Sequence, residues 1–149
     1  MEVTPQIIGK YNQREQEQWE IEFALEVFEL TNLEREKYGL PKFKSMALLT
    51  EVATTRAWET TVSFSHTRPD GTKFSTAYPG SLLSGGYYVG ENIAAGQTSP
   101  EKVVQAWMNS EGHRANILDP DFEYLGIGFY YVNDGSYRYY WSQNFYTKY

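Results

Sequence analysis

Two histidines and one glutamate are the residues of this chain whose types could do chemistry together. His66 and His113 are the only histidines among 149 residues, and each lies at the predicted edge of a helix, outside any periodic apolar stripe. Glu91 lies between them in the sequence and directly follows Gly90, and a glycine lets the backbone approach a site closely. Two imidazoles with one or two carboxylates can coordinate Zn²⁺ and leave a position open. The same groups can act as acid and base, because histidine titrates near neutral pH.

The spacing of these residues leaves a plainer interpretation open. His66 and His113 lie far apart in the chain and do not form a short-spaced ligand pair such as His-Glu-x-x-His. An isolated histidine is usually a surface or core residue. The tyrosine-rich stretch 137–140 also has two interpretations, because it could stack on a sugar or lipid or could simply be good strand material.

Missing residues and motifs argue against other kinds of chemistry. The chain has no cysteine, and therefore no disulfide, no thiolate nucleophile and no cysteine-ligated zinc. It has no Gly-x-Ser-x-Gly motif, and its glycine-rich segment 80–90 lacks the Walker pattern, which argues against a nucleophile-elbow hydrolase and a nucleotide site. A net charge of −6 without a lysine- or arginine-rich stripe argues against nucleic-acid binding.

The length and composition favour one globular domain, since 41% of the residues are hydrophobic and 17% are aromatic. No run of about 18 apolar residues is present, so we do not expect an integral membrane protein. No signal-peptide pattern opens the sequence. Residues 1–14 lack periodicity and are expected to form an extended lead-in, and residues 15–149 are expected to form the domain.

Hydrophobic periodicity predicts two helices in the first part of the chain. They cover about residues 15–37 and 45–62, and Ser45 is the expected cap of the second. The second helix has a mostly apolar face that includes one charged residue, Arg56. The segment 63–97 is punctuated by glycine and proline and is expected to be irregular, with a short strand or two.

A third helix has the clearest predicted start. Ser99 is a good N-cap, and Pro100 occupies the first helical position. Gly112 is expected to end this helix in the left-handed conformation, and a short helical turn over residues 114–118 follows.

The last part of the chain predicts a β-hairpin. Residues 125–132 and 137–146 have strand character, and Asn133-Asp134-Gly135 is a hairpin turn signal. Gly126 and Gly128 share one face of the first strand, which suggests that another element packs closely against it. Helices with a small antiparallel sheet indicate an α+β chain, in which the helices cover the faces of the sheet.

Four blocks of the sequence resemble the signature blocks of the CAP superfamily, which includes cysteine-rich secretory proteins, insect antigen 5 and plant pathogenesis-related class 1 proteins. The blocks are Gly-Glu-Asn-Ile at 90–93, Trp-Met-Asn-Ser-Glu-Gly-His-Arg-Ala-Asn-Ile-Leu at 107–118, Leu-Gly-Ile-Gly at 125–128 and Tyr-Trp-Ser-Gln-Asn-Phe at 140–145. The chain is most similar to the cysteine-free bacterial branch, often called SCP-like. The resemblance implies a secreted protein and a three-layer α-β-α sandwich with a surface cleft.

The resemblance also implies a cluster of two histidines and two acidic residues in that cleft. His66, Glu91 and His113 match three of these positions. The fourth position falls on Ser110, which is not acidic, and the adjacent Glu111 is the alternative. Some members of the superfamily hold a divalent cation at this cluster, so zinc is the candidate cofactor and the two histidines are its candidate ligands. A site with only three of the four residues would bind a metal weakly or not at all.

Three further polar residues are candidates for supporting roles. Asn92 belongs to the first block, and Ser110 belongs to the second. Gln143 lies in the last strand and either lines the cleft or is an ordinary strand residue. Trp107 and Ile117 are expected to pack their helix against the sheet.

Three functions are open, and we rank them. The first is a non-enzymatic extracellular binding module for a small molecule, lipid, peptide or cell-envelope fragment, since no activated nucleophile is present. The second is a structural or adhesion domain with a vestigial cleft, whose tyrosine-rich strands make the contacts. The third is a metal-dependent, protease-like hydrolase, in which zinc on His66 and His113 activates water and Glu91 is the base. An enzymatic role is the less expected outcome, although the fold does not fix the function.

Overall fold

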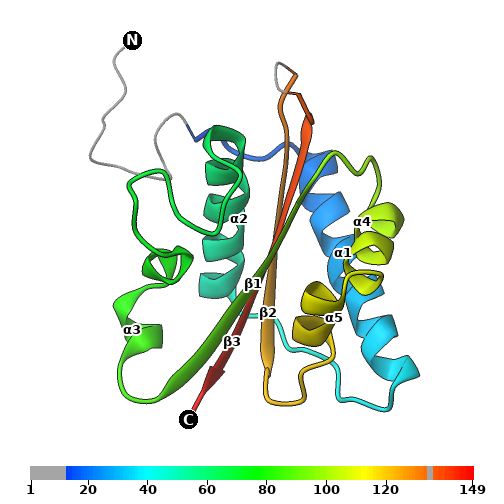
Figure 1. The fold of residues 1–149 in the computed structure, drawn as a ribbon, viewed down its shortest axis with the longest axis vertical. Helices are drawn as coiled ribbons and strands as arrows, with labels where there is room; N and C mark the ends of the chain where they lie inside the picture. The colour runs from blue at the N-terminus through cyan, green and yellow to red at the C-terminus, as the bar shows by residue number, and fades with distance from the viewer. Residues whose placement is uncertain (1–12, 134–135) are drawn as a thin grey trace.

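The computed structural model describes residues 13–133 and 136–149, so that residues 1–12 of the predicted lead-in lie outside the described residues. Its elements, in chain order, are α1 (Gln18–Lys37), α2 (Ala47–Val62), the 3-10 helix η1 (Phe74–Ala77), α3 (Gly80–Leu83), β1 (Tyr87–Ala95), α4 (Pro100–Met108), α5 (Glu111–Ile117), β2 (Tyr124–Tyr131) and β3 (Tyr139–Lys148). The sheet forms the middle layer, with α2, η1 and α3 on one face and α1, α4 and α5 on the other (Figure 1). The predicted α-β-α sandwich of the α+β class is confirmed.

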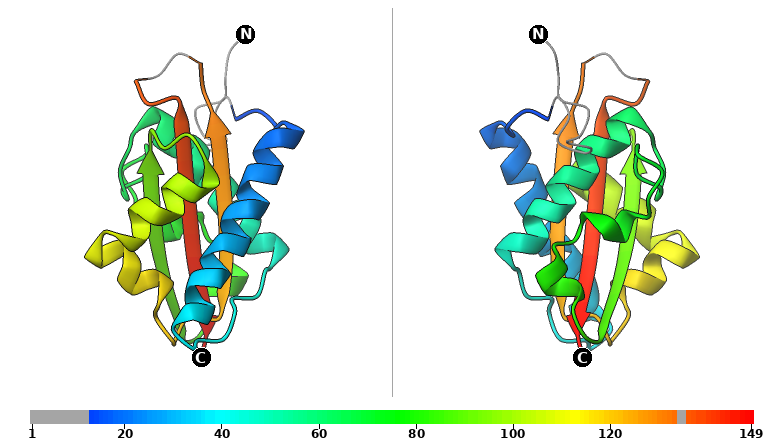
Figure 2. Two further views of the ribbon diagram at one scale, coloured as in Figure 1. Left: turned by 90° about the vertical axis from the view of Figure 1, so that its right-hand side faces the viewer. Right: turned by 90° about the vertical axis from the view of Figure 1, so that its left-hand side faces the viewer.

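The last strand in the sequence, β3, is the central strand of the sheet. The strand order is β1-β3-β2, and both pairs are antiparallel. Asn144 of β3 lies opposite Glu91 of β1 on one side and Gly126 of β2 on the other. β1 and β2 are therefore the two edges, as the two side views show (Figure 2). Side chains from both helical layers can meet beside an edge strand.

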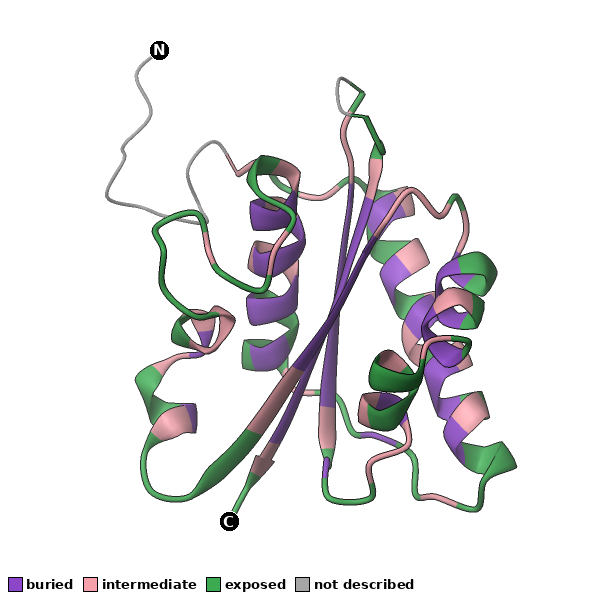
Figure 3. Ribbon diagram, viewed as in Figure 1, coloured by how far each residue is buried: buried purple, intermediate pink, exposed green. Residues whose placement is uncertain are grey.

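The larger core fills the space between the sheet and the layer of α1, α4 and α5. Trp107 of α4 and Ile117 of α5 are buried there in one cluster with Phe129 and Trp141 of the sheet. The indole Nε1 of Trp107 donates to the carbonyl of Ile93 at 3.2 Å, which satisfies its buried polar atom. Buried residues follow the strands and the inner sides of the helices (Figure 3). The predicted packing of Trp107 and Ile117 is confirmed.

On the other face, the backbone of α2 packs directly against two glycines of β2. A Cβ atom added at Gly126 would lie 2.4 Å from the carbonyl oxygen of Leu49, and one at Gly128 would lie 2.0 Å from that of Ala53. No side chain fits at these distances, so the two glycines set how closely α2 approaches the sheet. The predicted close contact on this face is confirmed.

A buried carboxylate ties the start of α1 to the end of β2. Glu20 accepts two hydrogen bonds from the guanidinium of Arg14, at 2.7 and 2.8 Å, and one from the backbone N–H of Tyr131 at 2.7 Å. It also closes a capping box with the backbone N–H of Glu17 at 2.8 Å. Burial raises the pKa of Glu20, but these hydrogen bonds outweigh it and hold that pKa below its ordinary value.

The boundaries of α2 and α4 differ in part from the prediction. Ser45 does not cap α2, because Met46 occupies the cap position and no side chain makes a capping hydrogen bond there. Gly112 does not end a helix, since α4 ends at Met108 and Gly112 lies inside α5 with a negative φ. The two polar residues between α4 and α5 break the helix earlier, because such side chains compete for backbone hydrogen bonds. The predicted cap at Ser99 is confirmed, since its Oγ accepts from a backbone N–H at 3.2 Å.

The segment that was expected to be irregular contains the nine-residue strand β1. Pairing with β3 along its whole length overrides the local glycine signals. The two strands of the predicted hairpin are present with boundaries shifted by one or two residues, and Asp134 and Gly135 of the predicted turn lie outside the described residues. None of the helices within 13–133 and 136–149 has both the length and the apolar character needed to cross a bilayer.

Candidate functional site

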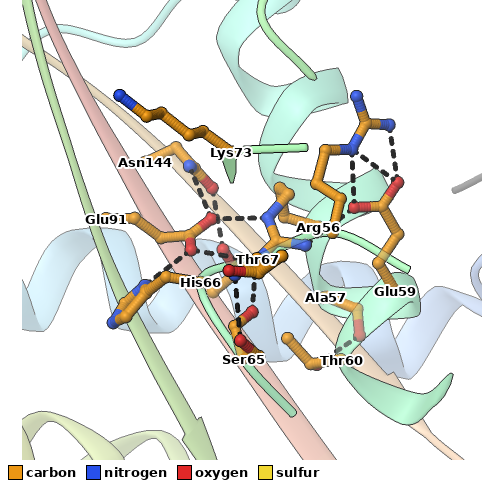
Figure 4. A network of polar contacts seen from close by, with 12 residues as sticks. Arg56, Ala57, Glu59, Thr60, Ser65, His66, Thr67, Lys73, Glu91 and Asn144 are labelled. Carbon is orange, nitrogen blue, oxygen red and sulfur yellow. Dashed lines mark hydrogen bonds and ion pairs between the residues drawn. The ribbon is translucent and has the colours of Figure 1, made fainter. Parts of the chain in front are cut away.

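The carboxylate of Glu91 lies at the centre of a buried polar network on the α2 face of β1 (Figure 4). Arg56 of α2 donates to both of its oxygens, from Nε at 2.7 Å and from an Nη at 3.0 Å. Asn144 of β3 donates to it at 3.1 Å. Nδ1 of His66 lies 2.8 Å from Oε1 of the same carboxylate. Because an ionised carboxylate only accepts, Nδ1 of His66 carries the proton, and Nε2 is the nitrogen left for other contacts.

These donors keep Glu91 ionised. Burial raises the pKa of Glu91, but the hydrogen bonds from His66 and Arg56 and the positive charge of Arg56 outweigh burial and hold that pKa below the ordinary value. With both of its oxygens engaged, the carboxylate orients its neighbours and is a weak proton acceptor.

Arg56 connects Glu91 to the loop that carries His66. Its other donors reach Glu59, one turn further along α2, at 2.7 Å and the carbonyl of Ser65 at 2.7 Å. Arg56 is fully buried; burial lowers its pKa, but the contacts with Glu91 and Glu59 raise it more. The carbonyl of Ser65 directly precedes His66, so the guanidinium places both the carboxylate and the histidine that contacts it.

A second arginine anchors the same loop. Nε and an Nη of Arg68 donate to the carboxylate of Glu59 at 3.0 and 2.6 Å, and its other Nη donates to Thr76 at 3.0 Å. Glu59 thus lies between two guanidinium groups, one from its own helix and one from the loop. His66 lies between these anchors with a side chain that is 54% exposed.

His113 approaches the same edge of the sheet from the opposite layer. It lies in α5 and is half-buried, with Nδ1 2.8 Å from Oγ of Ser110. Burial lowers the pKa of His113, and the charge of His66 lowers it further. His66 and His113 thus reach the β1 edge from opposite layers, one in the loop that follows α2 and the other in α5.

Two of the three supporting residues, Asn92 of β1 and Gln143 of β3, lie on the other face of the sheet, and the third, Ser110, contacts His113. Asn92 donates to the carbonyl of His113 at 3.1 Å and to Oε1 of Gln143 at 3.0 Å. Gln143 is fully buried and donates in turn to Thr31 of α1 at 2.9 Å. Asn92 therefore joins α5, which carries His113, to the sheet, and the buried Gln143 holds Asn92 in place.

Glu111 is not part of this network. It is the exposed first residue of α5, where a negative side chain interacts favourably with the helix dipole. Ser110, and not Glu111, contacts His113. Within the described ranges, no three His, Cys, Asp or Glu residues are arranged to hold a metal ion. Since the oxygens of Glu91 are engaged by Arg56, the residues present do not fit a closed zinc site.

A family model described as the Cysteine-rich secretory protein family, CAP, matches residues 28–145, most of the chain. The chain belongs to the CAP family.

Relatives of this CAP chain include bacterial proteins. YkwD of Bacillus subtilis (strain 168) is 41% identical over 130 aligned residues, in an alignment that covers 85% of this chain and 48% of YkwD. A solved extracellular protein containing an SCP domain from Bacillus anthracis str. Ames is 30% identical, with a TM-score of 0.73 over 93% of this chain and 46% of that one. An outer surface protein from Borrelia burgdorferi shares the fold at 19% identity, with a TM-score of 0.73 over 92% and 98% of the two chains. The chain spans about half the length of the first two relatives.

The resemblance to the CAP superfamily points to His66, Glu91 and His113, but the groups that position them are not apparent from the sequence. Arg56 falls within the mostly apolar face of the predicted second helix. Asn144 lies inside a signature block but has no spacing signal of its own. The available signal was Arg56 itself, because a charged residue within an apolar stripe must find a buried partner.

Proposed function

We propose that this CAP domain acts outside the cell as a non-enzymatic binding module whose ligand contacts the imidazoles of His66 and His113. The extracellular location is supported by the B. anthracis relative, which is described as an extracellular protein containing an SCP domain. Candidate ligands are polar groups of a small molecule, a peptide or a cell-envelope fragment.

The engagement of Glu91 by Arg56, Asn144 and His66 is the observation that carries this proposal. A general base works best when its pKa lies near the operating pH, and the pKa of Glu91 is lowered instead. Hydrolysis with Glu91 as the base is therefore disfavoured. The same contacts hold the ring of His66 in one orientation, which suits recognition of a ligand.

The nitrogens left for a ligand are Nε2 of each imidazole. Nδ1 of His66 is bound to Glu91 and Nδ1 of His113 is bound to Ser110. A neutral imidazole with a protonated Nδ1 offers a hydrogen-bond acceptor at Nε2, and a protonated one offers a donor. Two such groups from opposite layers can hold one polar ligand between them.

The test follows the imidazole signals of the two histidines by NMR while muropeptides, peptides, phospholipid vesicles and Zn²⁺ are titrated in turn. The single variants His66→Ala and His113→Ala assign the two signals. We expect one ligand class to shift both signals together, and each variant to weaken its binding by about tenfold or more, a loss of about 1.4 kcal/mol. Gln105→Ala, an exposed position on α4, is the control and should bind as the parent chain does.

Two results would overturn the proposal. One is a ligand that binds equally well after both histidines are replaced. The other is cleavage of a peptide library, with or without added zinc, that disappears in His66→Ala but persists in Gln105→Ala.

A further inference from the structure

A groove of about 1170 Å³ lies between α1 and α2, at the β2 edge of the sheet. Its walls come from the start of α1 and the first half of α2, and Tyr130 of β2 contributes to it. The two imidazoles lie beside β1, the opposite edge, so the groove is separate from the site described above. Its volume is comparable to that of a small-molecule binding site and can hold several side chains.

The α1 wall of the groove is apolar and unpartnered. Ile21 and Leu25 are 38% and 59% exposed, lie one turn apart on the same side of the helix, and belong to neither hydrophobic core. On the α2 wall, the hydroxyls of Thr50 and Thr54 donate to carbonyls of their own helix, at 3.2 and 2.8 Å. Those hydroxyls are therefore already satisfied, and the groove offers mainly apolar contact along its length.

The charge of the groove is negative. Glu15 and Glu51 line it, are exposed, and have no ion-pair partner within the described ranges. Arg14 also lines it, but its guanidinium is engaged by Glu20 at 2.7 Å. In addition, Oε1 of Gln13 is buried and accepts no hydrogen bond from any described residue. Among the described residues that line it, the groove therefore lacks a free cation and has acceptors that a ligand could use.

We propose that this groove binds a basic amphipathic peptide segment of a partner protein. Apolar side chains of the segment pack against Ile21 and Leu25, and its lysines or arginines pair with Glu15 and Glu51. This interaction surface is separate from the imidazole site, because the groove lies at the β2 edge of the sheet and the imidazoles lie beside β1 at the other edge.

The test uses a fluorescent leucine–lysine amphipathic peptide, titrated with the full chain at about 0.15 M salt, where long-range attraction is screened. A leucine–glutamate peptide of the same pattern is the counter-probe and should not bind. We expect Leu25→Lys to weaken binding of the basic peptide by about tenfold or more. Leu33→Lys makes the same charge change at an exposed position of the same helix outside the groove, and should leave the affinity unchanged.

A matched carboxylate pair completes the design. Glu51→Gln should weaken binding several-fold, whereas Glu36→Gln, on an exposed pair with Lys42 outside the groove, should not. Equal loss in Leu25→Lys and Leu33→Lys would show nonspecific attraction to the net negative charge and would overturn the proposal. So would the absence of binding, or a dimer in sedimentation that Leu25→Lys dissociates, which would assign the groove to a second copy of the chain.

Discussion

Arg56 is the residue on which the geometry of the imidazole site depends. A buried guanidinium must be matched by buried acceptors, and here Glu91, Glu59 and the carbonyl of Ser65 supply them. Each acceptor belongs to a different segment, so one side chain fixes the relative positions of α2, β1 and the loop that carries His66. A lysine could not reproduce this arrangement, because it lacks the planar fork of donors.

Replacing Arg56 with methionine should destabilise the domain by about 3–5 kcal/mol, because the variant leaves Glu91 buried without its charged partner. Glu59 retains Arg68 and is less affected. The double variant with Glu91→Gln removes the stranded charge and should recover part of the loss. Urea denaturation of the parent chain, Arg56→Met and the double variant measures these free energies of unfolding. A double variant less stable than Arg56→Met alone would show that the unpaired charge of Glu91 is not the cause of the loss.

At the scale of the elements, the contact of α2 with β2 depends on the absence of two side chains. Gly128→Ala places a Cβ 2.0 Å from the carbonyl oxygen of Ala53, so α2 must move away from the sheet. We expect a loss near the upper end of about 1–3 kcal/mol, together with a disturbed imidazole site, because Arg56 moves with its helix. Gly112→Ala is the matched control, since nothing lies within 4 Å of its added Cβ.

In that control, alanine replaces glycine inside α5 at an ordinary helical conformation, so the melting temperature should stay constant or rise. Thermal unfolding followed by circular dichroism compares the two variants. Equal destabilisation by both would show that the contact with Ala53 is not the cause.

The elements differ in how far they could be predicted. The helices follow from apolar periodicity and, for α4, from the cap at Ser99, and the strands of the hairpin follow from their strand character and the turn signal between them, all of which are local signals. A short strand or two was expected in the segment that contains β1, but the position and length of β1 were not, because it places polar Glu91 and Asn92 on its two faces, where partners from distant segments bury them. His66, Glu91 and His113 could be identified as a set from the resemblance to the CAP superfamily. The role of Arg56 could not, because its acceptors Ser65 and Glu91 are 9 and 35 residues away and become its neighbours only in the fold.

At the scale of the whole molecule, two buried carboxylates should make the free energy of unfolding depend on pH. The pKa values of Glu20 and Glu91 are both lowered from 4.5. As the pH falls, the unfolded chain binds protons before the folded one does, so the stability that these groups contribute is present above about pH 4.5 and is lost below it. The difference in unfolding free energy between the parent chain and Glu91→Gln should therefore shrink on acidification.

Urea denaturation at a series of pH values from about 7 to about 3 measures that difference. Glu36→Gln, which removes an exposed carboxylate, is the control and should follow the parent chain throughout. A difference that grows as the pH falls would show that Glu91 is not ionised in the folded state.

The position of β3 has a consequence for how the protein is made. Neither β1 nor β2 has a strand partner until Tyr139–Lys148 has been synthesised and has left the ribosome. Earlier nascent chains can form helices but cannot assemble the sheet, because β3 supplies all of its strand pairing. Such a chain therefore remains without a paired sheet for longer than a chain whose first strands pair with each other.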